Sequence, residues 1–314
     1  MNGFGNGTTT DEVLSGLDLT GRRYLVTGAN SGLGTETVRA LTAHGAHVTA
    51  AVRDPDAARD VLDPLLGNRP EALDTVRIDL GDLTSVRAAA AELLDRGGRF
   101  DGVCNNAGLA STPPGTTVDG FETQFGTNHV GHFVFVARLL PLLLDGPPVR
   151  VVNVSSAAHR LAAVDLDDPN WERTPYEKWA AYGASKSANI LHAVELTRRY
   201  ADRGLVANAV HPGGISTRLG RHLVPGDREA IPDIMRRTGE AAYKSLEAGT
   251  ATQVWALTHP SLEGVGGRYL LDCSIGEEYE HPEAIGGHAP WALDADAARR
   301  LWTISEELTG ESVS

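Results

Sequence analysis

Short apolar runs alternate with longer helical patterns along most of this chain. The runs are rich in β-branched residues, as in strands that are buried on both faces of a sheet. They predict strands over residues 23–27, 47–52, 75–78, 102–104, 149–154, 206–210 and 268–271. The helical patterns lie between them, over residues 32–44, 56–66, 83–96, 120–144, 182–203 and 246–258. Strands that alternate with helices imply right-handed crossovers. The pattern therefore predicts an α/β domain of Rossmann type: a doubly wound parallel sheet with helices on both faces.

Two long stretches interrupt this alternation, over residues 157–181 and 213–245. Irregular segments beside strand ends in such a sheet usually enclose ligands, so we expect the second stretch to be a substrate loop. No repeat or linker divides the sequence. We therefore expect a flexible tail over residues 1–16 and a single domain over residues 17–314, which includes the substrate loop and a C-terminal extension.

Composition narrows the classes of function. The 314 residues include no apolar run near the ~18 residues of a membrane span, and the first residues lack the regions of a signal peptide. We therefore expect a cytoplasmic protein that does not bind membranes. A net charge of -13 repels phosphate backbones and argues against a nucleic-acid partner. Cys104 and Cys273 are too few for a disulfide framework and show no metal-ligand spacing.

A glycine-rich turn follows the first predicted strand and leads into a helix. Its glycines permit a tight turn, and they let backbone amides approach a pyrophosphate at the positive end of the helix. This strand-turn-helix context favours a dinucleotide site over an ordinary glycine turn. The predicted cofactor contacts in the turn are Gly28, Asn30, Ser31, Gly32, Leu33 and Gly34.

The spacing of these glycines resembles that of the short-chain dehydrogenase/reductase family. Five further segments fit the family in order over roughly residues 20 to 275: Asn105-Asn-Ala-Gly108, Asn128, Val154-Ser-Ser156, Tyr182-Gly-Ala-Ser-Lys186, and His211-Pro-Gly213 with Thr217. Three segments resemble the retinol dehydrogenase and WW-domain oxidoreductase branch in particular, although the sequence carries no WW module. They are Val152-Asn-Val-Ser-Ser-Ala-Ala-His159, Asn128-His-Val-Gly-His-Phe133 and Ala292-Leu-Asp-Ala-Asp-Ala-Ala-Arg-Arg-Leu-Trp302.

The resemblance implies the rest of the cofactor site. Asn105 and Gly108 would support the adenine ribose, and Asp79 would meet the adenine edge, although Asp79 suits a turn carboxylate nearly as well. The other positions implied are Leu80 and Ala107, and, at the nicotinamide, Pro212, Gly213, Ile215 and Thr217.

Cofactor choice depends on the end of the second predicted strand. An acid there binds the ribose 2′-hydroxyl of NAD, whereas a cation accepts the 2′-phosphate of NADP. Val52 occupies the position that is acidic in NAD-preferring relatives, and Arg53 follows it. A guanidinium pairs bidentately with phosphate, so the sequence favours NADP over NAD. Asp54 leaves two alternatives open, because it could bind the 2′-hydroxyl or pair with Arg53.

Tyr182 and Lys186 are four residues apart in a predicted helix, so their side chains share one face. An adjacent ammonium favours the phenolate, which would let Tyr182 accept an alcohol proton or return it. By the resemblance, both residues also contact the cofactor, Ser156 orients the substrate oxygen, and Asn128 holds a water that connects Lys186 to solvent. We predict that these four residues form the catalytic tetrad.

Aromatic residues with few fixed charges indicate a bulky, fairly apolar alcohol or ketone as substrate. The predicted substrate contacts are Ser156, His159, Trp171, Trp179 and Leu219. A retinoid and a polycyclic or lipid-like ketone suit the pattern equally. His129 and His132 are three apart, but no third ligand is apparent, so we interpret them as packing residues and predict no metal.

Together these features predict an NADP-preferring oxidoreductase that moves a hydride between the cofactor and a small-molecule alcohol or ketone. Two alternatives stay open: a cofactor-binding scaffold without turnover, and a lyase or epimerase on the same fold. Helices over 120–144 and 182–203 often form a homodimer interface in the family, so the resemblance also implies a homodimer unless the C-terminal extension blocks it.

Overall fold

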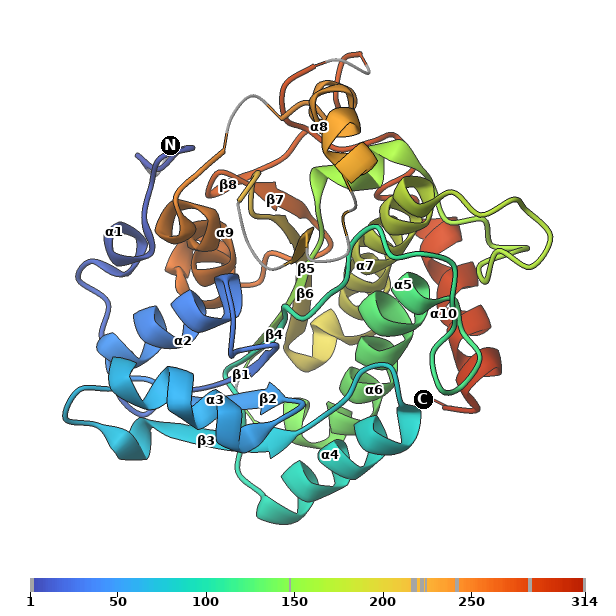
Figure 1. Ribbon diagram of the computed structural model, residues 1–314. Coiled ribbons are helices and arrows are strands. Elements are labelled where there is room, and N and C mark those ends of the chain that lie inside the picture. Colours follow the sequence, from blue (N-terminus) through green and yellow to red (C-terminus); the bar gives the residue numbers. More distant parts are fainter. Residues whose placement is uncertain are drawn as a thin grey trace.

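A single mostly parallel sheet runs through the middle of the protein (Figure 1). The computed structural model describes residues 3–146, 148–215, 219–220, 223, 225–240, 243–281 and 284–312. In this part of the chain the strands are β1 (Arg23–Thr27), β2 (His47–Val52), β3 (Leu73–Arg77), β4 (Gly102–Asn105), β5 (Val149–Val154), β6 (Leu205–His211), β7 (Tyr269–Leu271) and β8 (Ser274–Ile275).

The strand order is β3-β2-β1-β4-β5-β6-β7-β8. All neighbours pair in parallel except β7 and β8, which form an antiparallel edge. The chain reverses its direction of travel across the sheet between β1 and β4. In doubly wound sheets such a switch point opens a crevice at the carboxyl ends of the strands, where ligands bind. The predicted fold class is confirmed.

Helices cover both faces of the sheet (Figure 1). On one face α1 (Thr10–Leu14), α2 (Leu33–Ala43), α3 (Pro55–Leu62) and α9 (Leu246–Thr258) share one apolar core. On the other face α4 (Leu83–Arg96), α6 (Gly131–Leu143), α7 (Lys178–Tyr200) and α10 (Ala295–Thr309) share the second. The short α5 (Thr123–Phe125) precedes α6, and α8 (Pro225–Thr238) lies above the carboxyl ends of the strands. No helix in the described ranges is long and apolar enough to cross a membrane.

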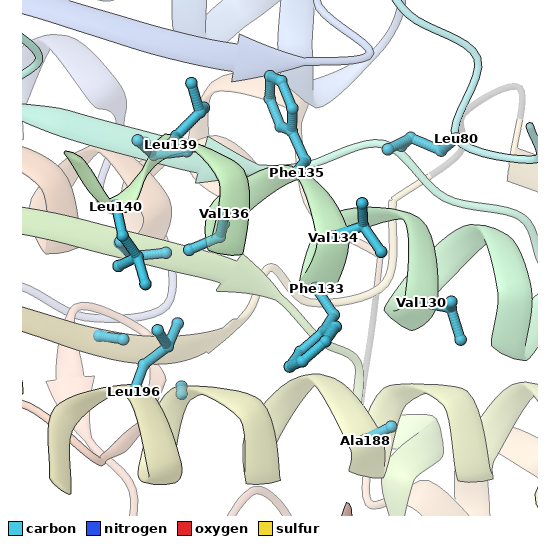
Figure 2. Packing of buried hydrophobic residues seen from close by; sticks show 14 of the residues in the cluster. Leu80, Val130, Phe133, Val134, Phe135, Val136, Leu139, Leu140, Ala188 and Leu196 are labelled. Atoms are coloured by element: carbon cyan, nitrogen blue, oxygen red, sulfur yellow. The ribbon is translucent and has the colours of Figure 1, made fainter. Parts of the chain in front are cut away.

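The second core depends on α6, which is apolar on nearly every side. Phe133 of α6 points toward α7, where Ala188 and Leu196 lie, whereas Phe135 points away from α7 (Figure 2). A helix that is apolar all round is stable only when it is enclosed, here by the sheet, α4 and α7. Pro141 lies near the C-terminal end of α6, and the helix continues for only two residues beyond it.

The structure differs from the sequence prediction at the N-terminal end of the chain. Residues 1–16 were expected to be a flexible tail, but Thr10–Leu14 form α1, in which a Thr9–Glu12 capping box closes the first turn. Val13 and Leu14 are buried against the first core. At the other end, α10 packs along α7 and belongs to the same core, so the C-terminal extension is part of the domain.

Six histidines are buried among the described residues, and four of these are at most 4% exposed: His129, His132, His159 and His192. Burial disfavours the imidazolium, and it lowers the pKa of His129 and His159 to about 3 and that of His132 to about 4. The pKa of His192 is also lowered, again chiefly by burial. These side chains are neutral in the folded protein.

Stability should therefore fall as the solution is acidified. The unfolded chain would bind protons near the ordinary histidine pKa of about 6.5, whereas the folded chain would not, so unfolding is favoured below that pH. We expect the free energy of unfolding in urea to drop between pH 7 and pH 5 by up to about 2 kcal/mol for each buried histidine.

His192→Asn should make this dependence shallower, whereas His281→Gln, at an exposed position, should leave it unchanged. An equal pH dependence in wild-type protein and His192→Asn would contradict the assignment.

Candidate active site

The turn after β1 is folded too tightly for side chains at two positions. Gly28 has φ +63°, and a Cβ there would lie 2.9 Å from Cβ of Ala107. A Cβ on Gly34 would lie 2.3 Å from the carbonyl oxygen of Gly28. Only glycine allows the β1 turn, the start of α2 and the loop after β4 to approach this closely. The backbone amides at the start of α2 are thereby left open to an anion.

A cavity of about 560 Å³ opens beside this turn, at the switch point between β1 and β4. Most of the predicted cofactor contacts line it: Gly28, Asn30, Ser31, Gly32, Leu33, Arg53, Asp79, Leu80, Ala107 and Gly108. They come from the ends of β1, β2, β3 and β4, four strands that the sequence alone could not order. Val52 and Asp54, which the sequence analysis weighed for cofactor choice, and Leu219, a predicted substrate contact, also line it. Sequence reasoning missed other lining residues, namely Ala51, Ile78, Asn106, Leu109 and Thr127.

Asn105 does not line this cavity, which corrects the sequence prediction. It is the last residue of β4, it is buried, and its Nδ2 donates to Oδ1 of Asn153 on β5 at 2.8 Å. The next residue, Asn106, lines the cavity instead, and its Nδ2 donates to the carbonyl oxygen of Thr27 at 2.8 Å. The strand ends one residue later than predicted, which moves the first loop position from Asn105 to Asn106.

The two acidic positions at the cavity wall have local partners. Asp54 caps α3, because its Oδ1 accepts a hydrogen bond from the amide of Ala57 at 3.1 Å. Its carboxylate is thus turned toward the helix start, while Arg53 is exposed at the cavity wall. Asp79 accepts a hydrogen bond from the amide of Gly81 at 3.0 Å, as expected of a turn carboxylate. It also lines the cavity, so contact with the adenine edge stays a prediction.

Tyr182 and Ser156 meet in a second cavity of about 530 Å³. Ser156 follows β5, accepts a hydrogen bond from the amide of Ala158 at 3.1 Å, and also hydrogen-bonds the phenol of Tyr182. Ser155 is turned away, and its hydroxyl donates to the carbonyl oxygen of Lys186 at 2.8 Å. The structure therefore brings Ser156, rather than Ser155, to the phenol.

Lys186 lies one turn further along α7, next to Gly108 in the wall of the first cavity. Its Nζ is 3.3 Å from the place where a Cβ on Gly108 would be, and it donates to the carbonyl oxygen of Val154 at 2.9 Å. The same Nζ is 5.7 Å from the ring centroid of Tyr182. Tyr182 thus lines the second cavity, whereas Lys186, four residues later on the same face of α7, lines neither cavity and lies behind Gly108 of the first.

Burial controls the protonation of both groups in this state. It raises the pKa of Tyr182 to about 12, opposed by the hydrogen bond with Ser156 and assisted by the negative charge of Glu240. It lowers the pKa of Lys186 to about 8. This differs from the sequence expectation that the ammonium lowers the pKa of the phenol, because the desolvation of Tyr182 is the larger effect here.

Asn128 lies in a π-helical turn, Gly126–Val130, just before α6. Such turns are rare and are frequent at functional sites. Oδ1 of Asn128 accepts from the amide of Leu109 at 2.8 Å, and Nδ2 donates to Oγ of Ser185 at 2.9 Å. The side chain therefore joins the loop after β4 to α7, next to Lys186 and Gly108. The water-holding role that the resemblance implied stays a prediction.

The second cavity is lined mostly by apolar side chains. Its described residues are Ala110, Ser156, Ala158, Trp179, Tyr182, Gly213, Gly214, Ile215, Leu219, Gly220, Leu223, Ile231, Ile234, Met235, Thr238, Glu240 and Tyr243. Trp179 and Leu219 are among them, and their role as substrate contacts stays a prediction. Leu219 also lines the first cavity, so the two cavities adjoin.

Among the described residues, three further predicted contacts, His159, Trp171 and Pro212, line neither cavity, as is also true of Gly34, Asn105 and Lys186. His159 is fully buried, where its Nδ1 hydrogen-bonds the carbonyl oxygen of Ser156 and its Nε2 accepts from the amide of Ala289. Trp171 packs edge-on against Tyr176. Pro212 is buried beside the cavities without lining either. Thr217 lies outside the described residues.

His129 and His132 make separate hydrogen bonds, as the packing interpretation expects. Nε2 of His129 meets Oγ of Ser305, and Nε2 of His132 meets Oγ1 of Thr27, each at 2.9 Å. Within the described ranges, no group of three histidine, cysteine or acidic side chains is placed to hold a metal ion.

Comparison with known proteins identifies the family. A family model described as short chain dehydrogenase matches residues 22–227. A Streptomyces lividans protein named "Probable oxidoreductase" is 41% identical over 292 residues, covering 91% of this chain and 97% of that protein. Retinol dehydrogenase 14 of Homo sapiens is 37% identical over 305 residues, covering 92% of this chain and 87% of that protein. The chain belongs to the short-chain dehydrogenase/reductase family of oxidoreductases, and the resemblance stated from its motifs is confirmed.

Solved structures share the fold. An uncharacterised protein from Mycobacterium paratuberculosis matches with a TM-score of 0.74 and 33% identity, covering 98% of this chain and 99% of that one. Pseudomonas aeruginosa RhlG, solved as an NADP active-site complex, matches with a TM-score of 0.63 and 25% identity, covering 81% of this chain and 95% of that one. The glycine cradle and the cavity at the switch point fit a nicotinamide dinucleotide.

The close approach at Gly34 should be indispensable for cofactor binding. A Cβ there would force the Gly28 carbonyl to move and open the turn, so Gly34→Ala should weaken NADPH binding roughly tenfold or more. Gly7→Ala, where a Cβ meets nothing within 4 Å, is the matched control. Fluorescence titration would disprove the role of the turn if both variants bound NADPH as the wild type does.

Proposed function

We propose that this protein is an NADP-preferring alcohol dehydrogenase or ketoreductase, with Tyr182 as the proton-transfer group. The observation that carries the proposal is the placement of Tyr182 and Lys186. One turn of α7 places the phenol in the wall of the apolar cavity and the ammonium beside Gly108, which lines the adjoining glycine-lined cavity. A substrate oxygen in the apolar cavity can meet Tyr182 and Ser156 together.

A nicotinamide cofactor bound in the first cavity would supply the hydride acceptor or donor and, when oxidised, a positive charge. Tyr182 would then take the hydroxyl proton of an alcohol, or give its own proton to a ketone oxygen. Ser156 would hold that oxygen in place through its hydroxyl. Lys186, with its pKa lowered to about 8 by burial, would still be mostly protonated at neutral pH, and its charge would favour the phenolate.

Arg53 supports the preference for NADP. It is exposed at the wall of the first cavity, and its neighbour Asp54 is engaged at the start of α3. A free guanidinium at this strand end suits a 2′-phosphate, whereas a carboxylate that caps a helix is less available to a 2′-hydroxyl. The NADP complex of RhlG supports a nicotinamide cofactor without deciding between the two forms.

The apolar cavity supports a bulky substrate. Trp179, Leu219, Ile231, Ile234 and Met235 line it, and they would contact a hydrocarbon body rather than a sugar or a small acid. A cytoplasmic location, a homodimer and the absence of nucleic-acid and membrane partners stay predictions. The scaffold and the lyase or epimerase alternatives predict no net NADPH oxidation with any ketone, which a panel of ketones and aldehydes tests directly.

The first prediction from this proposal concerns Arg53. A charge-assisted contact with phosphate contributes about 1.5 to 3 kcal/mol, so the protein should bind NADPH roughly tenfold or more tightly than NADH. Arg53→Ala should remove most of that difference in fluorescence titrations. Arg299→Ala, on the far helix α10, should leave it intact. Equal affinities of the wild type for both cofactors would overturn the preference.

The second prediction concerns Tyr182. Tyr182→Phe keeps the ring and loses the proton carrier, so turnover should fall by roughly 10² to 10⁴ while NADPH affinity stays nearly unchanged. Alcohol oxidation by the wild type should also speed up as the pH rises toward the pKa of the phenol, because the phenolate is the base. Tyr279→Phe controls for the loss of a tyrosine hydroxyl elsewhere. More than about a tenth of wild-type activity in Tyr182→Phe would exclude this role.

A further inference from the structure

Glu240 is the only charged residue among the described residues of the apolar cavity. Its side chain is 18% exposed. One carboxylate oxygen lies 3.2 Å from Nε2 of His211, and no other described residue donates a hydrogen bond to the carboxylate. A carboxylate has two acceptor oxygens, so its second oxygen can accept a further hydrogen bond. Burying an ionised carboxylate among apolar groups costs free energy unless it is paired, so a donor on the substrate would be favoured here.

His211 is fixed as a donor to this carboxylate. Its Nδ1 accepts a hydrogen bond from the amide of Ala157 at 3.0 Å, which leaves the proton on Nε2, facing Glu240. Burial raises the pKa of Glu240, but the hydrogen bond from His211 and the charge of Lys244 outweigh it, and the pKa ends below its usual value. Glu240 is therefore ionised at neutral pH.

The backbone holds Glu240 in place. Gly239 has φ +70°, and a Cβ on it would clash with the carbonyl oxygen of Ala284 and the guanidinium of Arg160, each 2.2 Å away. Arg160 donates to the carbonyl oxygens of Thr238 at 3.0 Å and Ala284 at 2.8 Å. These hydrogen bonds join the chain after α8 to the segment after Ser156, and they hold Glu240 in the wall of the cavity.

We propose that Glu240 determines substrate specificity by binding a hydrogen-bond donor, an ammonium or hydroxyl group, at a second position on an otherwise apolar substrate. The proposal rests on the proposed function, because it assigns the reacting oxygen to Tyr182 and Ser156. Tyr182, Ser156 and Glu240 all line the same cavity, so a substrate held by Tyr182 and Ser156 would also face Glu240. A carboxylate substrate would be repelled, because like charges in a dry cavity are strongly unfavourable.

The test uses four ketones that differ in one group: 4-arylcyclohexanones with a methyl, hydroxymethyl, aminomethyl or carboxylate substituent at the para position. In the wild type, the ratio kcat/KM should be roughly tenfold or more higher for the aminomethyl ketone than for the methyl ketone, since charge-assisted hydrogen bonds are the strong ones. The hydroxymethyl ketone should lie between them, and the carboxylate ketone should be the poorest.

Glu240→Gln keeps an acceptor for His211 and removes the charge, so the protein should fold and the spread across the four ketones should collapse to within about threefold. Glu229→Gln, at an exposed position of α8, should keep the wild-type order. An order that is unchanged in Glu240→Gln, or a wild type that does not discriminate, would overturn the proposal.

Calorimetric titration of the four ketones separates this proposal from the proposed function. If none of them is reduced but the aminomethyl ketone binds the wild type best and loses that advantage in Glu240→Gln, the redox assignment fails and the role of Glu240 stands. If the wild type binds all four equally, or none, the role of Glu240 fails whatever the turnover.

Discussion

The hydroxyl of Thr27 holds the two halves of the site together. Thr27 is the last residue of β1 and is fully buried. Its Oγ1 accepts hydrogen bonds from the amides of Asn106 and Ala107, each at 3.0 Å, and meets Nε2 of His132 at 2.9 Å. The other ring nitrogen of His132 meets the carbonyl oxygen of Asn128, so Nδ1 carries the proton and the hydroxyl donates to Nε2. One hydroxyl thus connects the glycine turn, the loop after β4 and the π-helical turn.

This connection explains why neutral histidines are built into the core. His132 can accept from Thr27 only while Nε2 is unprotonated, and burial keeps it so by lowering its pKa to about 4. A protonated ring would lose the acceptor and place a cation near Lys186. The same burial that makes the fold sensitive to acid therefore keeps the hydrogen bonds around Asn128 in a single arrangement.

The sequence predicted the parts of the fold in which local pattern and tertiary environment agree. β1, β2, β5, α4 and α9 begin and end where the pattern places them, because apolar runs and helix caps such as Asp82 act locally. α8 was not predicted, since Pro232 and its many charged residues hide the helical period. α10 was also missed, although Ala298, Leu301, Trp302 and Ser305 follow a helical spacing after the Asp294 cap and could have revealed it.

The candidate site was predictable to the extent that motifs fix backbone position. Tyr182, Lys186 and Ser156 lie together because helix spacing and the end of β5 place them. Asn105 and His159 were predicted to contact ligands, but both side chains point into the protein. The direction of a side chain at a strand end or in a short turn depends on the register with neighbouring strands, which the sequence does not reveal. Glu240 carries no motif at all. It is recognised as a candidate substrate contact only in the structure, where the turn at Gly239 places it in the same cavity as Tyr182.

The C-terminal extension packs against α7, the helix that carries Tyr182 and Lys186. Trp302 of α10 packs edge-on against Phe133 of α6 with ring centroids 5.0 Å apart, and Arg199 of α7 lies 4.5 Å from its ring. Ser305, which is also on α10, hydrogen-bonds His129 through its hydroxyl. α10 thus covers α7, the helix that carries Tyr182 and Lys186, on the side away from the cavities. A homodimer that used this surface of α7 would have to displace α10 with its buried Trp302.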